Sequence, residues 1–192
     1  MPSRIAVSDS AVFHPRSSAP QALYVGWDRD DVIRAAIVGA TMTRTISSTS
    51  EGSRMIVQEM IPSRVIMVRL DPGQDLLIGL RQAVEETGIS HGAILAGVGS
   101  LSEYHFHVVS TPVMPPENAF VRGTGPYDIL TVTGAILDGR VHAHLTFSNT
   151  DIAMGGHLEE GCIVLTFAIV TIIDTSTPAL EMSAWDHVER SG

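Results

Sequence analysis

The chain has 192 residues, enough for one full hydrophobic core with an appended arm, because single domains usually run to about 100–200 residues. Apolar residues make up 44% of the chain and charged residues 17%, which excludes the charge-rich, apolar-poor composition of a disordered protein. The 12 Lys and Arg residues against 21 Asp and Glu give a formal charge of −9, and no basic run is dense enough to follow a phosphate backbone. Composition therefore disfavours direct nucleic-acid binding.

The N-terminal part predicts neither a signal peptide nor a membrane span. The first thirty residues lack the basic-then-apolar order of a signal peptide, and the apolar stretch at 32–42 is too short to cross a bilayer. Cys162 is the single cysteine, and its place at the head of an apolar run predicts a small buried hydrophobe. We expect a cytoplasmic protein with no membrane partner.

A Ser/Thr/Gly-rich stretch at 45–53 separates a mixed N-terminal arm from a strongly patterned remainder, with the boundary near Ser63. In the arm, DDVIRAAIVGA (30–40) predicts a short helix. The arm alone could bury little apolar surface. We therefore expect residues 1–63 to form an accessory arm and linker.

A strand and the main helix follow this boundary. RVIMVRL (64–70) alternates as a strand does. Asp71, Pro72 and Gln74 then match the N-cap, the first helical position and the capping box of a helix start. Apolar residues recur at helical spacing until Gly88, which supplies a left-handed stop. The sequence predicts a helix that starts at Asp71 and stops at Gly88.

The later segments favour strands. AILAGVG (93–99) predicts a short buried strand, and LSEYHFHVVS (101–110) alternates as a second one. DILTVTGAIL and RVHAHLTFS flank a tight Asp-Gly turn at 138–139, which predicts a hairpin. CIVLTFAIVTII (162–173) is continuously apolar, as in a strand covered on both faces. The sum is an α+β fold with a mainly antiparallel sheet and one main helix, and its leftover apolar face predicts self-association.

Three histidines gather in VHAHLTFSNTDIAMGGHL (141–158). On the strand, His142 and His144 point to one face with Cα atoms about 6.6 to 6.8 Å apart, so that both can chelate one ion. The glycines at 155–156 allow close backbone approach and deliver His157 as a third ligand. Three neutral nitrogens plus a water make the open geometry of a catalytic or exchangeable zinc site, although imidazole also suits iron, nickel and manganese. The alternative is a solvated polar strand face followed by a turn residue.

Around such an ion, a carboxylate for proton transfer and a cation for an anionic substrate group would be useful. The candidates by residue type and position are Asp128, Asp151, Glu103 and Glu159 for the first role, and Arg122 or Arg140 for the second. For each of them a turn or surface role is the alternative. His105 and His107 line the same cavity if their strand neighbours the hairpin, and otherwise lie on the opposite side of the sheet. Motifs for a serine nucleophile elbow, a CxxC centre, a P-loop or a dinucleotide site are absent from the sequence.

The order of these motifs resembles the plant-and-prokaryote-conserved (PPC) domain family. The resemblance rests on RLDPGQDLLIGL, GAILAGVGSLS, GPYDILTVTG and HAHLTFSNTDIAMGGHLEEG, followed by the long apolar strand. It covers about residues 64–175 and leaves 176–192 as a C-terminal tail. It implies an α/β domain with a strongly bent, mainly antiparallel sheet that assembles as a homotrimer. In GPYDIL, Tyr127 and Asp128 stand where the family usually has Phe and Glu.

The same fold group is similar to acetolactate decarboxylase, whose metal is held by a His-x-His pair and a later histidine. Carried across, these positions are His142, His144 and His157. The resemblance thus implies that they bind a divalent ion, with zinc the first expectation. Plant members of the family carry an AT-hook before the domain, but its Arg-Gly-Arg-Pro type of core is absent from residues 1–63.

Two functions are expected as alternatives. The first is a metal-dependent lyase or hydrolase that acts on a small anionic carboxylate or carbonyl compound, with Asp128, Glu103 and Arg122 as its candidate catalytic residues. The second is a DNA-binding or regulatory trimer without catalytic activity, in which the histidines are structural or sense a metal.

Overall fold

The structure, a computed structural model, describes residues 48–50, 53–55, 57–176, 182 and 185–186. The arm up to residue 47, with its expected helix, therefore lies outside the described residues, as does most of the C-terminal tail. Two short strands, β1 (Ser48–Ser50) and β2 (Ser53–Met55), pair antiparallel with each other. The main sheet and the three histidines lie in the continuous segment 57–176.

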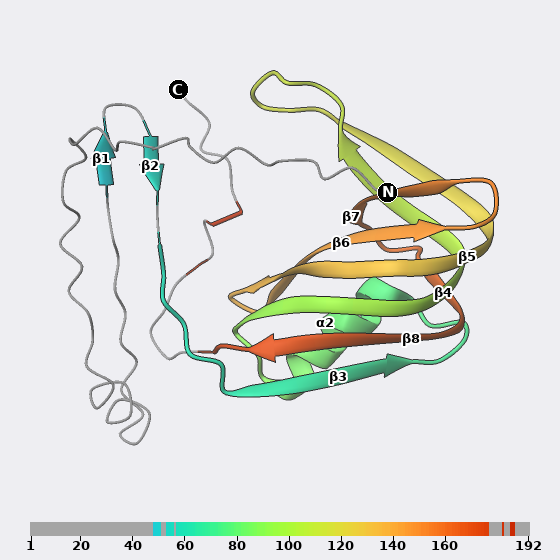
Figure 1. Cartoon of the computed structure of the whole chain (residues 1–192), viewed down its shortest axis with the longest axis horizontal. Coiled ribbons are helices and arrows are strands. Elements are labelled where there is room, and N and C mark those ends of the chain that lie inside the picture. The colour runs from blue at the N-terminus through green and yellow to red at the C-terminus, as the bar shows by residue number, and fades with distance from the viewer. Residues whose placement is uncertain (1–47, 51–52, 56, 177–181, 183–184, 187–192) are drawn as a thin grey trace, which may run out of the picture. The chain divides into compact units, whose positions relative to one another are not determined.

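Six antiparallel strands form the main sheet, in the order β3-β8-β4-β5-β6-β7 (Figure 1). Their bounds are β3 (Arg64–Leu70), β4 (His91–Val109), β5 (Asn118–Leu137), β6 (Arg140–Ser148), β7 (Ala153–Leu158) and β8 (Ile163–Asp174). The end strand β7 also pairs with β4, so that β4, β5, β6 and β7 curl back on themselves. The long strands β4 and β5 bend at β-bulges, where the pairing register shifts. This bent, mainly antiparallel sheet with a helix packed on it confirms the predicted fold class.

Helix α2 (Leu76–Thr87) starts later than the sequence predicts. Its N-cap is Asp75, whose carboxylate accepts hydrogen bonds of 2.9 and 3.0 Å from two backbone N–H groups of the first turn. The start expected at Asp71 is wrong because Gly73 takes a left-handed φ of 83°, which turns the chain before the helix can begin. The helix ends as predicted at Gly88, whose φ is 67°. Among the described residues, no helix combines the length and apolar character needed to cross a membrane.

The predicted strands are present, but two of them merge, and β5 starts at Asn118, ten residues before the predicted start at Asp128. The two segments 93–99 and 101–110 belong to the single long strand β4. The predicted hairpin is confirmed, since β5 and β6 are joined at Asp138 and Gly139. These residues have φ values of 49° and 75°, the left-handed conformation that a tight hairpin turn requires.

The two faces of the sheet differ in what covers them. The inner face packs with α2 into the core, where Tyr104, Tyr127 and Phe147 lie with ring centroids 4.8 to 5.2 Å apart. On the outer face of β3, β4 and β8, large apolar side chains remain exposed: Val65, Met67, Val98, Leu165 and Phe167. Within this chain β8 is therefore covered on one face, not on both as its apolar run predicts, because no element of the described segment packs on the other.

Candidate metal centre

Strands β6 and β7 bring the three histidines together. His144 and His157 face each other as cross-strand partners, and His142 lies two residues before His144 on the same face of β6. A Cβ added at Gly155 or Gly156 would lie 2.3 or 2.4 Å from a backbone carbonyl oxygen of a neighbouring strand. The double glycine thus permits the close approach of β7, as the sequence predicts.

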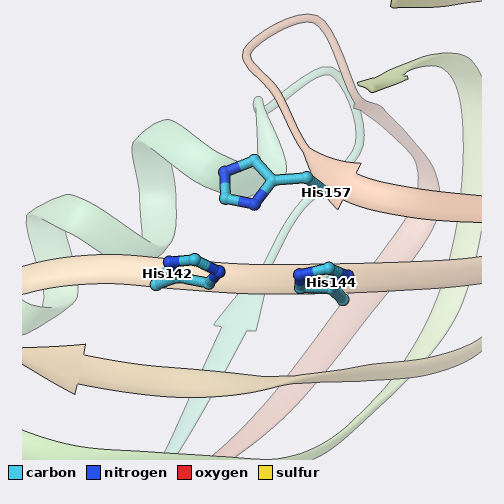
Figure 2. A group of neighbouring side chains, drawn as sticks. All are labelled: His142, His144 and His157. Atoms are coloured by element: carbon cyan, nitrogen blue, oxygen red, sulfur yellow. The ribbon is translucent and has the colours of Figure 1, made fainter. Parts of the chain in front are cut away.

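The three imidazole rings lie close enough for one ion (Figure 2). The ring centroids are 4.7 Å apart for His142 and His157, 5.4 Å for His144 and His157, and 5.6 Å for His142 and His144. One nitrogen of each ring lies within 4.8 Å of a nitrogen of the other two. Nitrogens around a tetrahedral zinc ion lie about 3.4 Å apart, so small side-chain rotations bring these three into ligating positions. The residues present therefore fit a divalent ion with open coordination positions.

Partial desolvation favours the neutral form of two rings. Desolvation, and then the nearby His107 and His142, lower the pKa of His157 to about 4. Desolvation, and then His142, also lower the pKa of His144. Because a metal ion binds the neutral imidazole, His144 and His157 are in the ligating form at neutral pH.

An aspartate of the C-terminal tail orients the third ring. His142 Nδ1 lies 3.2 Å from Oδ2 of Asp186, and Arg140 holds the same carboxylate at 2.9 Å. The hydrogen bond from Arg140 is the main cause that lowers the pKa of Asp186 to about 2. A carboxylate on Nδ1 leaves Nε2 of His142 for an ion, as in many carboxylate–histidine–metal arrangements. Sequence reasoning missed Asp186 because nothing in the tail signals a return to β6, and it offered Arg140 as a substrate-binding cation although Asp186 occupies it.

A fourth histidine borders the same cluster. His107 on β4 is the cross-strand partner of His157, with ring centroids 4.5 Å apart, and its Nδ1 lies 2.6 Å from Oε1 of Glu159. His105 is buried instead, and its Nδ1 lies 2.6 Å from the carbonyl oxygen of Glu160. Of the two alternatives for these histidines, His107 lies beside the candidate ligands, whereas His105 supports the loop after β7.

The structure does not gather the three candidate catalytic residues around the histidines within this chain. Asp128, Glu103 and Arg122 are all exposed. Asp128 faces Ser148, four residues beyond His144 on β6, which corresponds to about 13 Å along the strand. Glu103 pairs with Thr124 and Arg122 with His105, both on the β4–β5 ladder.

Asp128 lies at the opposite end of the hairpin from the Asp-Gly turn. Together with Ser100, Asn149 and Asp151 it lines an open hollow of about 620 Å³. Asp151 lies in the turn between β6 and β7. Its backbone N–H donates a hydrogen bond of 2.9 Å to Asn149 Oδ1. Of the two roles considered for Asp151, proton transfer and turn formation, this contact supports turn formation.

A bent antiparallel sheet with one packed helix and an open histidine cluster on its outer face defines the class of this protein as an α+β domain with a candidate metal centre. The comparison with protein families then identifies it. The model of the Plants and Prokaryotes Conserved (PCC) domain matches residues 57–176, more than half of the chain. The chain belongs to this family, which confirms the resemblance seen in the sequence.

The curated relatives and solved structures that the chain is similar to carry several different names. Two proteins of Synechococcus sp. named bifunctional protein GlmU are 29% and 30% identical over 113 residues, but the match covers 58% of this chain and only 17% of theirs. The metal-containing protein from Archaeoglobus fulgidus superposes with a TM-score of 0.58 at 23% identity, covering 66% of this chain and 90% of that one. A plant- and prokaryote-conserved protein from Pyrococcus horikoshii superposes with a TM-score of 0.57 at 23% identity, covering 66% of this chain and 89% of that one. A "putative dna binding protein" from Bacteroides thetaiotaomicron superposes with a TM-score of 0.52 at 17% identity, covering 73% of this chain and 87% of that one. At these identities the structural likeness shows a shared fold.

Proposed function

We propose that this protein binds a divalent metal ion, zinc before others, through His142, His144 and His157. The observation that carries the proposal is the convergence of three imidazoles from two paired strands, with one nitrogen of each within 4.8 Å of the others. Three neutral nitrogen ligands with open positions suit Zn²⁺ better than the oxygen-preferring ions. The name of the Archaeoglobus fulgidus neighbour, a metal-containing protein of the same fold, supports the same conclusion.

Metal analysis of protein purified without chelator or affinity-tag metal tests this proposal. We expect about one zinc ion per chain in the wild type and a loss of at least about 100-fold in affinity in His142→Ala and His144→Ala, because each removes a direct ligand. Thr146→Ala is the matched control, since Thr146 is exposed two residues beyond His144 on the same strand. Wild-type protein that neither contains nor binds zinc would overturn the proposal.

We further propose that the protein is a metal-dependent lyase or hydrolase that acts on a small carboxylate or carbonyl compound. This is in keeping with the predicted similarity to acetolactate decarboxylase. A divalent ion supplies a Lewis acid that polarises a substrate oxygen. Within one chain these three side chains do not lie around the histidines, so a neighbouring subunit of the proposed trimer would have to bring Arg122 to an anionic group of the substrate, and Asp128 and Glu103 to the protons that move. Within the described residues none of these three side chains forms an ion pair or a side-chain hydrogen bond, so their charges are available to a substrate.

A panel of small keto acids, hydroxy acids and esters, assayed with zinc-loaded protein, tests this chemistry. We expect turnover that disappears in His144→Ala and falls in Arg122→Ala mainly through a higher KM, because Arg122 binds the substrate. Glu160→Gln is the control, because Glu160 pairs with Arg81 on the helix. Turnover that is unchanged in His144→Ala would show that the histidine site does not carry it.

We also propose a homotrimer and a cytoplasmic location. The exposed apolar side chains on the outer face of β3, β4 and β8 support assembly, because monomers rarely leave so many on one surface. Val98→Asp should convert a trimer into monomers in analytical ultracentrifugation, whereas Ile78→Asp on the exposed side of α2 should leave the mass unchanged. A monomeric wild type would contradict the trimer. The lone buried Cys162 supports a reducing compartment.

DNA binding is the second candidate function, favoured by the name of the Bacteroides thetaiotaomicron neighbour. The formal charge of −9 opposes it. A gel-shift titration with duplex DNA at low salt tests DNA binding separately from metal binding. DNA binding predicts a complex whose affinity falls steeply with salt, and no shift at low salt removes this candidate.

A further inference from the structure

We infer that His107, His157 and Glu159 form a second metal site, which shares His157 with the three-histidine site and competes with it for the ion. One ligand atom from each of these side chains lies within 4.8 Å of the others. The inference rests on the proposed function only through the shared His157, because His142 and His144 take no part in the second site.

The second set is built on paired strands. His107 on β4 and His157 on β7 are direct cross-strand partners, and Glu159 follows β7 by one residue. Hydrogen bonding from the Glu159 N–H to the His105 carbonyl oxygen at 3.1 Å keeps the chain against β4 at this point. The backbone therefore holds all three positions.

The side chains already converge. His107 Nδ1 and Glu159 Oε1 lie 2.6 Å apart, and only 16% and 27% of these two side chains are exposed. Ligand atoms around one ion lie roughly 3.0–3.4 Å apart, so an ion would replace the shared proton and widen this pair slightly. The His107 and His157 rings lie nearer to each other, at 4.5 Å, than His157 lies to either histidine of β6.

The two sets differ in chemistry. Two imidazoles and one carboxylate can also hold catalytic Zn²⁺, but this set is typical of Fe²⁺ with open positions, and the carboxylate suits Mn²⁺ better than a third imidazole does. Three neutral imidazoles favour Zn²⁺. To hold both ions at once, His157 would have to bridge them as an imidazolate, which requires removing its last ring proton. We therefore assign one ion per chain, with Zn²⁺ on the His142 side and Mn²⁺ or Fe²⁺ on the Glu159 side.

Parallel titrations with Mn²⁺ and Zn²⁺, followed by Mn²⁺ electron paramagnetic resonance and calorimetry on the full chain, test the second site. We expect Glu159→Gln and His107→Ala to weaken Mn²⁺ binding at least tenfold and Zn²⁺ binding less than threefold. The double variant His142→Ala/His144→Ala should do the reverse, and His157→Ala should weaken both ions. Glu160→Gln is the matched control in the same loop, because its partner is Arg81.

The results separate the two proposals. Mn²⁺ binding that is absent in the wild type, or unchanged in both Glu159→Gln and His107→Ala, overturns the second site and leaves the zinc site standing. Zn²⁺ binding unchanged in the double variant overturns the zinc site instead. Unfolding midpoints measured in chelator establish that each variant is folded, and His107→Ala on β4 tests the site independently if Glu159→Gln does not fold.

Discussion

A buried histidine, His91, and the candidate metal ligands show how differently one residue type is used in this chain. His91, at the start of β4, is 2% exposed, and both of its ring nitrogens have partners: Nδ1 lies 3.0 Å from Ser90 Oγ and Nε2 lies 2.8 Å from Asp138 Oδ1. By contrast, among the described residues no polar group hydrogen-bonds to the ring nitrogens of His144 or His157. A histidine with both nitrogens occupied holds the fold together, whereas one with free nitrogens can bind an ion.

The partners of His91 show what it holds. Asp138 lies in the β5–β6 turn, and its second carboxylate oxygen accepts a hydrogen bond of 3.0 Å from the backbone N–H of Met182 in the tail. His91 thus links β4, the hairpin turn and the tail. The candidate metal ligands His144 and His157 differ from His91, because the rings nearest to them belong to other histidines.

The largest expected effect comes from His91→Ala. The change removes two part-buried hydrogen bonds and the volume of a buried ring, so we expect the free energy of unfolding to fall by about 2–4 kcal/mol. His144→Ala, at an exposed position, should cost less than about 0.5 kcal/mol in chelator. Urea denaturation of both variants measures the difference, and equal costs would break the distinction between His91 and the candidate metal ligands.

Zinc should make the cost of His144→Ala comparable to that of His91→Ala. At a free concentration of about 100 times Kd, zinc should raise the free energy of unfolding of the wild type by about 2.7 kcal/mol, because it binds only the folded chain. The same addition should not stabilise His144→Ala, but should stabilise His91→Ala about as much as the wild type. Thermal shifts with and without zinc give the measurement. A His144→Ala protein that zinc still stabilises would contradict the assignment of this ligand.

Asp186→Asn should produce a smaller change. The amide keeps the size of the side chain but loses the charge that holds His142 Nδ1, so we expect roughly tenfold weaker zinc binding, about 1.4 kcal/mol. Calorimetric titration measures it. Asp151→Asn is the control, because Asp151 is exposed in the β6–β7 turn. Equal affinity in Asp186→Asn and the wild type would show that Asp186 does not orient the ring.

The smallest effect concerns pH in the absence of metal. The pKa of His157 is lowered to about 4 in the folded chain, below the unfolded value of about 6.5. Between these values the unfolded state binds more protons, so the free energy of unfolding should fall as the pH drops from about 6.5 to about 4. Because the ring is half-exposed, solvent screening keeps the effect small.

Urea midpoints across this pH window, measured in chelator, check the prediction. The pH dependence should be weaker in His157→Asn, which cannot take up the proton, and unchanged in Thr146→Ala. A wild-type midpoint that rises on acidification would contradict the sign.

Much of the fold was predictable because its signals are local. Alternation placed His142 and His144 on one face, and Asp-Gly at 138–139 predicted the hairpin that carries them. The helix start was not predictable in the same way. The sequence has a capping pattern at Asp71, but Gly73 takes a left-handed conformation there and the helix starts later. The double glycine indicated that His157 could approach, but not which strands it would lie between.

The sequence by itself determined the alternation of strands, the hairpin turn, the helix stop and the face shared by two histidines, since each depends on residues a few positions apart. Only the tertiary structure decided that β7 lies between β6 and β4, so that His157 adjoins both His144 and His107. It also brought Asp186 to His142, 44 positions away, and Glu159 to His107, 52 positions away. The physical reason is that the chemistry of an imidazole is set by the partners of its nitrogens, and those partners come from long-range strand pairing and packing.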